Sequence, residues 1–163
     1  DDNPVLSATV AGTVNGDVLN YSLATSALKF SSVGSYPIVV TLGSNPNYQV
    51  TATDGTLSIT KKAATVTAND KFKTYGDDNP PLTATVLGAV NGDAIYYSLA
   101  TTASKFSDVG GYPIAVTLGS NPNYDVFKFD ATLSISPKAA SVTANDKSKV
   151  YGDDNPSLSA TVK

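Results

Sequence analysis

The feature that most constrains this chain is an internal repeat with a period of 76 residues. The tetrapeptide Asp-Asp-Asn-Pro begins at Asp1, Asp77 and Asp153. Residues 1–76 align with residues 77–152 without a gap, and about 54 of the 76 positions are identical. This period is longer than those of ankyrin or tetratricopeptide solenoids, so it predicts a small domain repeated in tandem.

Composition and alternation predict that the repeat is all-β. Val, Ile, Thr and Tyr are frequent, whereas the helix formers Glu, Arg and Met are absent. Apolar residues alternate with polar ones in segments 82–86, 95–99 and 112–118, as in half-buried strands. Asn91-Gly92 predicts a tight hairpin turn between the first two of these segments.

The last part of the repeat contains two further strand segments. Residues 124–129 and 132–135 are expected to form a hairpin, or one bulged strand, broken at Asp130-Ala131. Alternation then predicts a core made of one set of side chains and their first-copy counterparts: Leu82, Val86, Tyr97, Leu99, Tyr112, Ile114, Val116, Tyr124, Val126, Leu133 and Ile135.

The phase of the repeat follows from the variable positions Lys61-Lys62 and Pro137-Lys138, which come after the last strand of each copy. We therefore place a complete domain at 62–137. Residues 1–61 form a first repeat that lacks its opening strand, and 138–163 are the opening strand of a third. We expect tandem small β-sandwich domains of the immunoglobulin-like type, with a β-grasp-like fold as the alternative.

An ordered set of short motifs resembles the tandem MBG repeats of the YGX type. These motifs are Tyr75–Pro80, Asn91–Asp93, Val109–Ile114, Asn123-Tyr124 and Thr132–Ile135. The resemblance implies a non-enzymatic segment of a large bacterial surface or adhesin-like protein. Such a segment would be extracellular and would act as a stalk, a spacer or part of a fibre. Its first partners would be the neighbouring repeats.

The Val-Gly-x-Tyr-Pro element also resembles the tyrosine corner of immunoglobulin-like sandwiches. In that feature a Tyr at the start of a strand hydrogen-bonds to the chain just upstream. Tyr36 and Tyr112 are the residues in this position. Their expected role is structural.

Composition argues against several other classes of protein. The net charge is −3, and the 11 cationic side chains are all Lys and scattered, which disfavours nucleic-acid binding. His and Cys are absent, so there is no His base, thiolate nucleophile or Cys/His zinc site. No apolar run approaches the roughly 18 residues of a membrane span. We expect no enzyme activity and no cofactor, calcium excepted.

Acidic turns supply the one candidate metal site. Asp70, Asp77, Asp78 and Asp93 carry hard oxygen ligands of the kind that calcium takes. The first three lie near an expected joint between domains, where calcium could stiffen a stalk. The alternative is that Asp and Asn beside Pro or Gly serve only to build turns, and no EF-hand spacing is present.

Outward aromatic residues distinguish the second copy from the first. Tyr96, Phe127 and Phe129 replace Asn20, Thr51 and Thr53, and positions that accept Asn or Thr are poor core positions. Exposed rings can stack on sugars or seal a protein interface. They therefore suggest a carbohydrate- or protein-binding module, with a glycan or a host cell-surface protein as ligand. The simpler interpretation is packing against a neighbouring domain or loop.

Lys73 and Lys105 are candidate donors for an intramolecular Lys–Asn isopeptide bond, and the simpler expectation for both is solvent exposure.

The phase also predicts a mode of assembly. Residues 1–61 lack the strand that 63–76 supply to the second copy, and residues 139–152 repeat that strand. Donating 139–152 to the first repeat of another molecule would join chains head to tail into rings or filaments. The alternative is that preceding residues of a longer chain complete the first repeat in cis.

Overall fold

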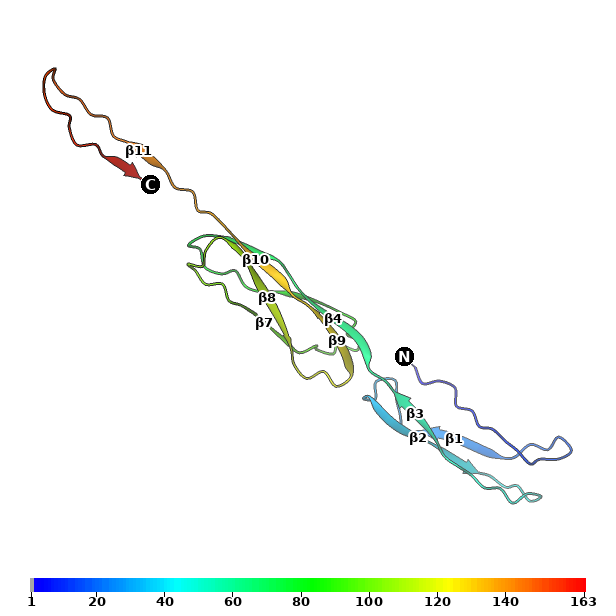
Figure 1. Cartoon of the computed structure of the whole chain (residues 1–163). Coiled ribbons are helices and arrows are strands. Elements are labelled where there is room, and N and C mark those ends of the chain that lie inside the picture. Colours follow the sequence, from blue (N-terminus) through cyan, green and yellow to red (C-terminus); the bar gives the residue numbers. More distant parts are fainter. Residues whose placement is uncertain (1) are drawn as a thin grey trace. The chain divides into compact units, whose positions relative to one another are not determined.

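The computed structural model describes residues 2–163, in which all regular structure is β-strand. No helix in this range could therefore cross a membrane. The strands, labelled in Figure 1 where there is room, are β1 (Tyr21–Thr25), β2 (Gly34–Leu42), β3 (Gly55–Ile59), β4 (Lys62–Ala68), β5 (Lys71–Thr74), β6 (Ala84–Leu87), β7 (Tyr97–Thr101), β8 (Gly110–Leu118), β9 (Tyr124–Phe129), β10 (Ala131–Ser136), β11 (Val142–Ala144) and β12 (Ala160–Val162).

The chain divides into two compact units. The first contains the residues up to Thr67 together with Thr85–Ser98 and Val116–Phe129, and the second contains Ala68–Ala84, Leu99–Ala115 and Asp130–Lys163. This division does not test the expected boundaries 1–61, 62–137 and 138–163, which stay a prediction.

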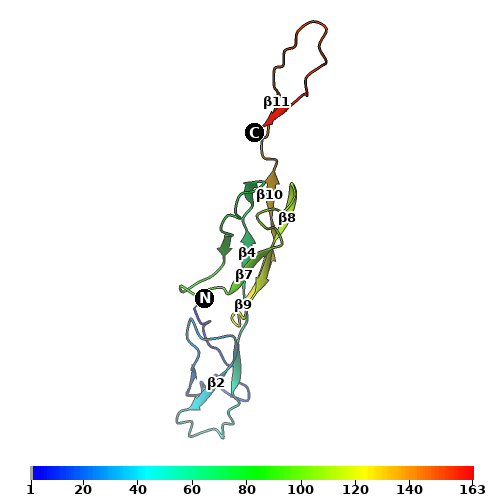
Figure 2. The ribbon, with the colours of Figure 1, turned by 90° about the vertical axis from the view of Figure 1, so that its left-hand side faces the viewer.

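In the first unit, β1, β2 and β3 form an antiparallel sheet with β2 in the centre. A second sheet has the order β6-β4-β9, in which β4 runs parallel to β9 with Ala64 opposite Val126. The parallel course of β4 and β9 can be followed in Figure 1 and again in Figure 2. The opening segment of the second repeat is thus paired within its own repeat.

The second unit holds most of a four-stranded sheet with the order β5-β10-β8-β7. Here β5 is parallel to β10, and β10 is antiparallel to β8. At the C-terminal end of the chain, β11 and β12 pair antiparallel. Several sheets without a helix confirm an all-β chain of the sandwich type. A β-grasp fold, which needs a helix against its sheet, does not fit residues 2–163.

Buried apolar side chains are concentrated in the second repeat. Of the buried hydrophobic residues only Ala27 precedes residue 62, and the others are Ala64, Val66, Ala68, Ile95, Ala103, Ile114, Val116, Tyr124, Leu133 and Ile135. The small residues of β4 are buried at every second position, so this strand lies with one face in the core.

The predicted core is therefore partly wrong. Ile114, Val116, Tyr124, Leu133 and Ile135 are buried as expected. The other predicted residues of the second copy, namely Leu82, Val86, Tyr97, Leu99, Tyr112 and Val126, are only partly buried. No first-copy counterpart is fully buried, and Val10 is 41% exposed. In the first copy, no segment within residues 2–163 occupies the place of β4.

The turn predicted at Asn91-Gly92 is confirmed, but the expected hairpins are not. Asn91 and Gly92 have φ of 57° and 74°, and the Asp93 amide donates to the Val90 carbonyl at 3.0 Å, which closes the turn. However, β6 and β7 on either side of it belong to different sheets, as do β9 and β10. The chain changes sheet at both places: β6 and β9 lie on either side of β4, whereas β7 and β10 belong to the sheet that contains β5 and β8.

The tyrosine corners are present in both copies. The Tyr112 hydroxyl donates to the Asp108 carbonyl at 3.0 Å, and the Tyr36 hydroxyl donates to the Ser32 carbonyl at 2.8 Å. Each bond spans four residues and holds the loop that precedes a long strand, so both tyrosines have the structural role that the resemblance implied.

Candidate functional site: a groove in the first repeat

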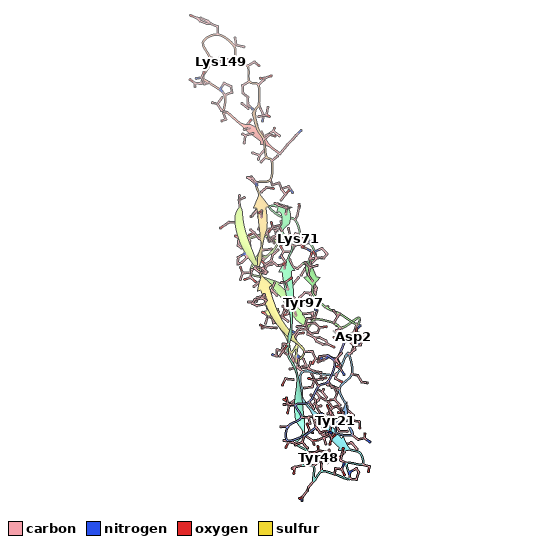
Figure 3. All side chains as sticks on the ribbon, turned by 90° about the vertical axis from the view of Figure 1, so that its right-hand side faces the viewer. Asp2, Tyr21, Tyr48, Lys71, Tyr97 and Lys149 are labelled. Carbon is pink, nitrogen blue, oxygen red and sulfur yellow. The ribbon has the colours of Figure 1, made fainter. Side chains whose placement is uncertain are left out.

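The first repeat contains an open groove of about 460 Å³. Its walls are residues 8–12 and 48–53, and its floor is made by Leu19, Tyr21, Val40 and Leu42. Figure 3 labels Tyr21 and Tyr48 at this place. The side chains that line it are mainly small, apolar or uncharged, so the groove suits an apolar occupant rather than an ion.

The same positions of the second repeat enclose a strand. Adding 76 to the wall residues gives 84–88 and 124–129, which contain β6 and β9, and β4 lies between these two strands. Adding 76 to Leu19 and Val40 gives Ile95 and Val116, which are 8% and 0% exposed. The groove is therefore the place of β4, left open in the first repeat.

The missing strand also explains a local difference between the copies. Residues 84–87 and 124–129 are strands, whereas their counterparts 8–11 and 48–53 have no regular structure. The backbones of β6 and β9 both pair with β4. Without it, the two walls of the groove lack the partner that makes them strands.

Two equivalent glycines, Gly88 and Gly12, differ in how closely the backbone of β4 approaches them. A Cβ added to Gly88 would lie 2.6 Å from the Ala63 carbonyl oxygen and 3.0 Å from the Ala64 Cα. A Cβ added to Gly12 would meet nothing within 4 Å, although Gly12 has almost the same φ, +85° against +89°. The first repeat thus keeps the backbone shape that admits a strand, in an open state.

One end of the groove is held by a tyrosine–aspartate pair. The Tyr48 hydroxyl donates to Asp17 Oδ2 at 2.7 Å and accepts the Val14 amide at 3.1 Å. The backbone bond with Val14 lowers the pKa of Tyr48, but the hydrogen bond to Asp17, burial and the charge of Asp17 raise it, and the net pKa lies above its ordinary value. These two hydrogen bonds hold the groove wall at this point.

The four acidic residues proposed as calcium ligands have separate surroundings. Asp70 Oδ1 accepts the Thr132 amide at 2.8 Å, Asp93 Oδ2 accepts the Tyr124 hydroxyl at 2.7 Å, and Asp78 pairs with Lys105 at 3.1 Å. The Asp77 amide donates to the Thr74 carbonyl.

Within residues 2–163 no group of three acidic side chains is arranged to hold a metal ion. Calcium binding stays a prediction, and the melting temperature in millimolar calcium against chelator tests it.

The outward aromatics lie where the comparison of copies placed them. Tyr96, Phe127 and Phe129 are 64%, 53% and 54% exposed. Phe127 and Phe129 are two residues apart on β9, so they share its outer face, opposite Thr65 and Thr67 of β4. Their exposure leaves them available for a ligand, which stays a prediction.

The expectation of an exposed Lys73 is wrong. This residue is 8% exposed, and its Nζ donates to the carbonyl oxygens of Ser104, Asp77 and Lys105 at 2.6, 3.1 and 3.4 Å. The carbonyls satisfy the buried ammonium group. Lys105 is partly exposed, with 47% side-chain exposure, and pairs with Asp78.

Sequence reasoning named the open first repeat and expected several residues of its groove, such as Val10 and Tyr21, in a closed core, but it did not predict a groove. Gly12 and Gly88 are shared between the copies, as are three further glycine pairs outside the Asn-Gly turns, so they give no specific signal in the sequence. Their different surroundings are visible only in three dimensions.

Comparison with known proteins gives one match. The family model described as MBG domain (YGX type) matches residues 1–58 and 64–134. No curated protein and no solved structure matches the chain. The two matched segments are the two copies of the repeat, and the gap between them, 59–63, contains the expected joint.

Proposed function

Because the chain belongs to the MBG domain (YGX type) family, we propose that it is a structural segment of a large extracellular protein of the bacterial surface. The family match indicates a repeat of large surface proteins of structural rather than enzymatic type. In this proposal the tandem domains act as a stalk or spacer of an adhesin, or as part of a fibre. Their constant partners are the neighbouring repeats.

One observation carries this proposal: the polar residues that recur between copies are used to build the fold. Asn79 Nδ2 donates to the Ala103 carbonyl at 2.6 Å, and its counterpart Asn3 donates to the Ala27 carbonyl at 2.5 Å. The Tyr124–Asp93 bond in the second copy matches the Tyr48–Asp17 bond in the first, both at 2.7 Å.

These bonds close loops of the fold in both repeats. Polar residues that serve turns and loop closure suit a domain with a structural role in a tandem array.

The length of the protein tests the spacer role. Chains with two, three and four complete repeats of the 62–137 type should increase their maximum dimension in small-angle X-ray scattering by the same step per repeat. A maximum dimension that does not grow with repeat number would contradict a spacer.

A second candidate function rests on the three exposed aromatics of the second repeat. Under this alternative the chain is a carbohydrate- or protein-binding module that uses Tyr96, Phe127 and Phe129 on its outer surface. The first copy supplies the matched control, since it carries Asn20, Thr51 and Thr53 at these positions.

We expect a glycan array to be blank for both the chain and the triple variant Y96N/F127T/F129T, with and without calcium. Saturable binding that the triple variant loses would replace the spacer role with the binding role.

A further inference from the structure

We propose that segments 62–74 and 124–136 form a mechanical clamp, which enables the second repeat to resist tension along the chain. The proposal rests on the stalk role proposed above and adds resistance to force to it. The two fail in different experiments: equal resistance to tension in two directions would overturn the clamp and leave the scattering test of the spacer role untouched. The argument begins with the pairing of these two segments.

The two segments are paired in one register. Residues 62–67 of β4 lie opposite 124–129 of β9, and residues 71–74 of β5 lie opposite 133–136 of β10. Both ladders are parallel, and in both of them each residue lies opposite the one 62 positions later in the chain. The chain changes sheet between the two ladders without losing this register. The strands that begin the repeat are thus paired with the strands that end it.

Asp70 maintains the register between the two ladders. It lies between β4 and β5, and its Oδ1 accepts a hydrogen bond from the Thr132 amide at 2.8 Å. Thr132 is again 62 positions after Asp70, so this side-chain bond follows the same register as the backbone pairs. The bond therefore connects the two segments at the point where the chain changes sheet.

Both ends of the paired segments carry further backbone bonds. At the start, the Lys62 amide donates to the Asn123 carbonyl at 3.0 Å. At the end, the Tyr75 amide donates to the Ser136 carbonyl at 2.9 Å. The Ser136 hydroxyl also donates to the Lys73 carbonyl at 3.3 Å. Pairing therefore extends to the residues at which tension would enter and leave the two segments.

Buried side chains hold both segments in place. Val66 on β4 and Leu133 on β10 are both 0% exposed, and Ile135 on β10 is 3% exposed. Lys73 on β5 is buried too, and its Nζ donates to three carbonyl oxygens. Sliding either segment along its partner would bring apolar side chains into water and break the bonds of a buried ammonium group. Side-chain packing therefore opposes the same movement as the backbone pairing.

The direction of the strands determines how this pairing responds to tension. Tension along the chain acts at Lys62, the first residue of one ladder, and at Ser136, the last residue of the other. Because the paired strands are parallel, it pulls them along their length in opposite directions. The evenly spaced bonds of a parallel ladder are then loaded together, whereas strands pulled apart from one end lose their bonds one after another. Loading the bonds together slows forced unfolding, which is governed by the unfolding rate.

Force spectroscopy on the whole chain compares the two directions of pulling. The chain contains no Cys, so a pair of introduced cysteines gives unique attachment points. Lys61→Cys with Pro137→Cys loads the clamp lengthwise, whereas Lys61→Cys with Pro122→Cys pulls β4 and β9 apart from one end. All three positions are exposed, which favours an undisturbed fold. At the same constant force, the time to the first rupture should be at least about tenfold longer in the lengthwise direction.

Asp70→Ala tests the connection between the two ladders. Loss of the bond to the Thr132 amide should shorten the lengthwise lifetime about three- to tenfold. In the other direction the lifetime should stay within about twofold, because that separation begins at Lys62 and reaches Asp70 last.

Asp125→Ala is the matched control, since Asp125 is an exposed carboxylate on β9, and it should stay within about twofold in both directions. Equal lifetimes in the two directions, or a lengthwise lifetime that Asp70→Ala leaves unchanged, would overturn the proposal.

Discussion

Truncation of the same isoleucine in each repeat measures what the opening strands contribute. Ile114 on β8 is 0% exposed, and its counterpart Ile38 on β2 is only partly buried. Ile114→Ala removes three buried carbons, worth roughly 2.4 kcal/mol at about 0.8 kcal/mol each. The cavity left in a closed core brings the expected cost to about 2–5 kcal/mol. Ile38→Ala removes carbons that are already partly in contact with water, so the expected loss of unfolding free energy is about 1 kcal/mol.

Hydrogen exchange read by mass spectrometry separates the two repeats in one molecule, at a concentration where the chain is monomeric. Since each 1.4 kcal/mol is a factor of ten, amides of β8 should lose roughly 30-fold or more in protection in Ile114→Ala. Amides of β2 should lose about fivefold in Ile38→Ala. Equal losses in the two repeats would show that the first core is already closed, and the reasoning from the missing strand would fail.

Three further predictions concern hydrogen bonds. Lys73→Met leaves carbonyls around Lys73 without their donor and should cost about 1–3 kcal/mol in urea unfolding, whereas Lys149→Met in the exposed tail should stay within about 0.5 kcal/mol. Tyr112→Phe removes the bond to the Asp108 carbonyl and should cost about 0.5–1.5 kcal/mol, with the loop before β8 exchanging faster. The third prediction concerns the pH dependence of stability. The backbone hydrogen bond with Val90 lowers the pKa of Tyr124, whereas the hydrogen bond to Asp93, burial and the charge of Asp93 raise it. The net pKa of Tyr124 lies above its usual value. A raised pKa stabilises the fold below about pH 10, and this contribution is lost as the pH rises through the folded-state pKa; Tyr124→Phe should therefore show a smaller loss of stability between about pH 9 and 11.

The strands of the second repeat could be predicted from sequence, because alternation depends on residues within the strand itself. Segment 124–129 was predicted with the bounds that β9 has. The neighbours of β9 could not be predicted, since its partner β4 lies about 60 residues away and local turn signals favoured pairing with β10. Burial of Lys73 was missed for the same reason: its carbonyl partners in Ser104 and Lys105 lie on a loop distant in sequence.

The candidate site was beyond sequence reasoning for a stronger reason, which the two copies make plain. Tyr48 and Tyr124 are the same amino acid, follow the same turn and make the same bonds to aspartate, yet a strand begins at Tyr124 and none begins at Tyr48. The copies differ in the residues that follow, with Thr51 and Thr53 in place of Phe127 and Phe129, and in the presence of β4 beside them. Strand formation at this position therefore depends on the completed sheet as well as on the local sequence.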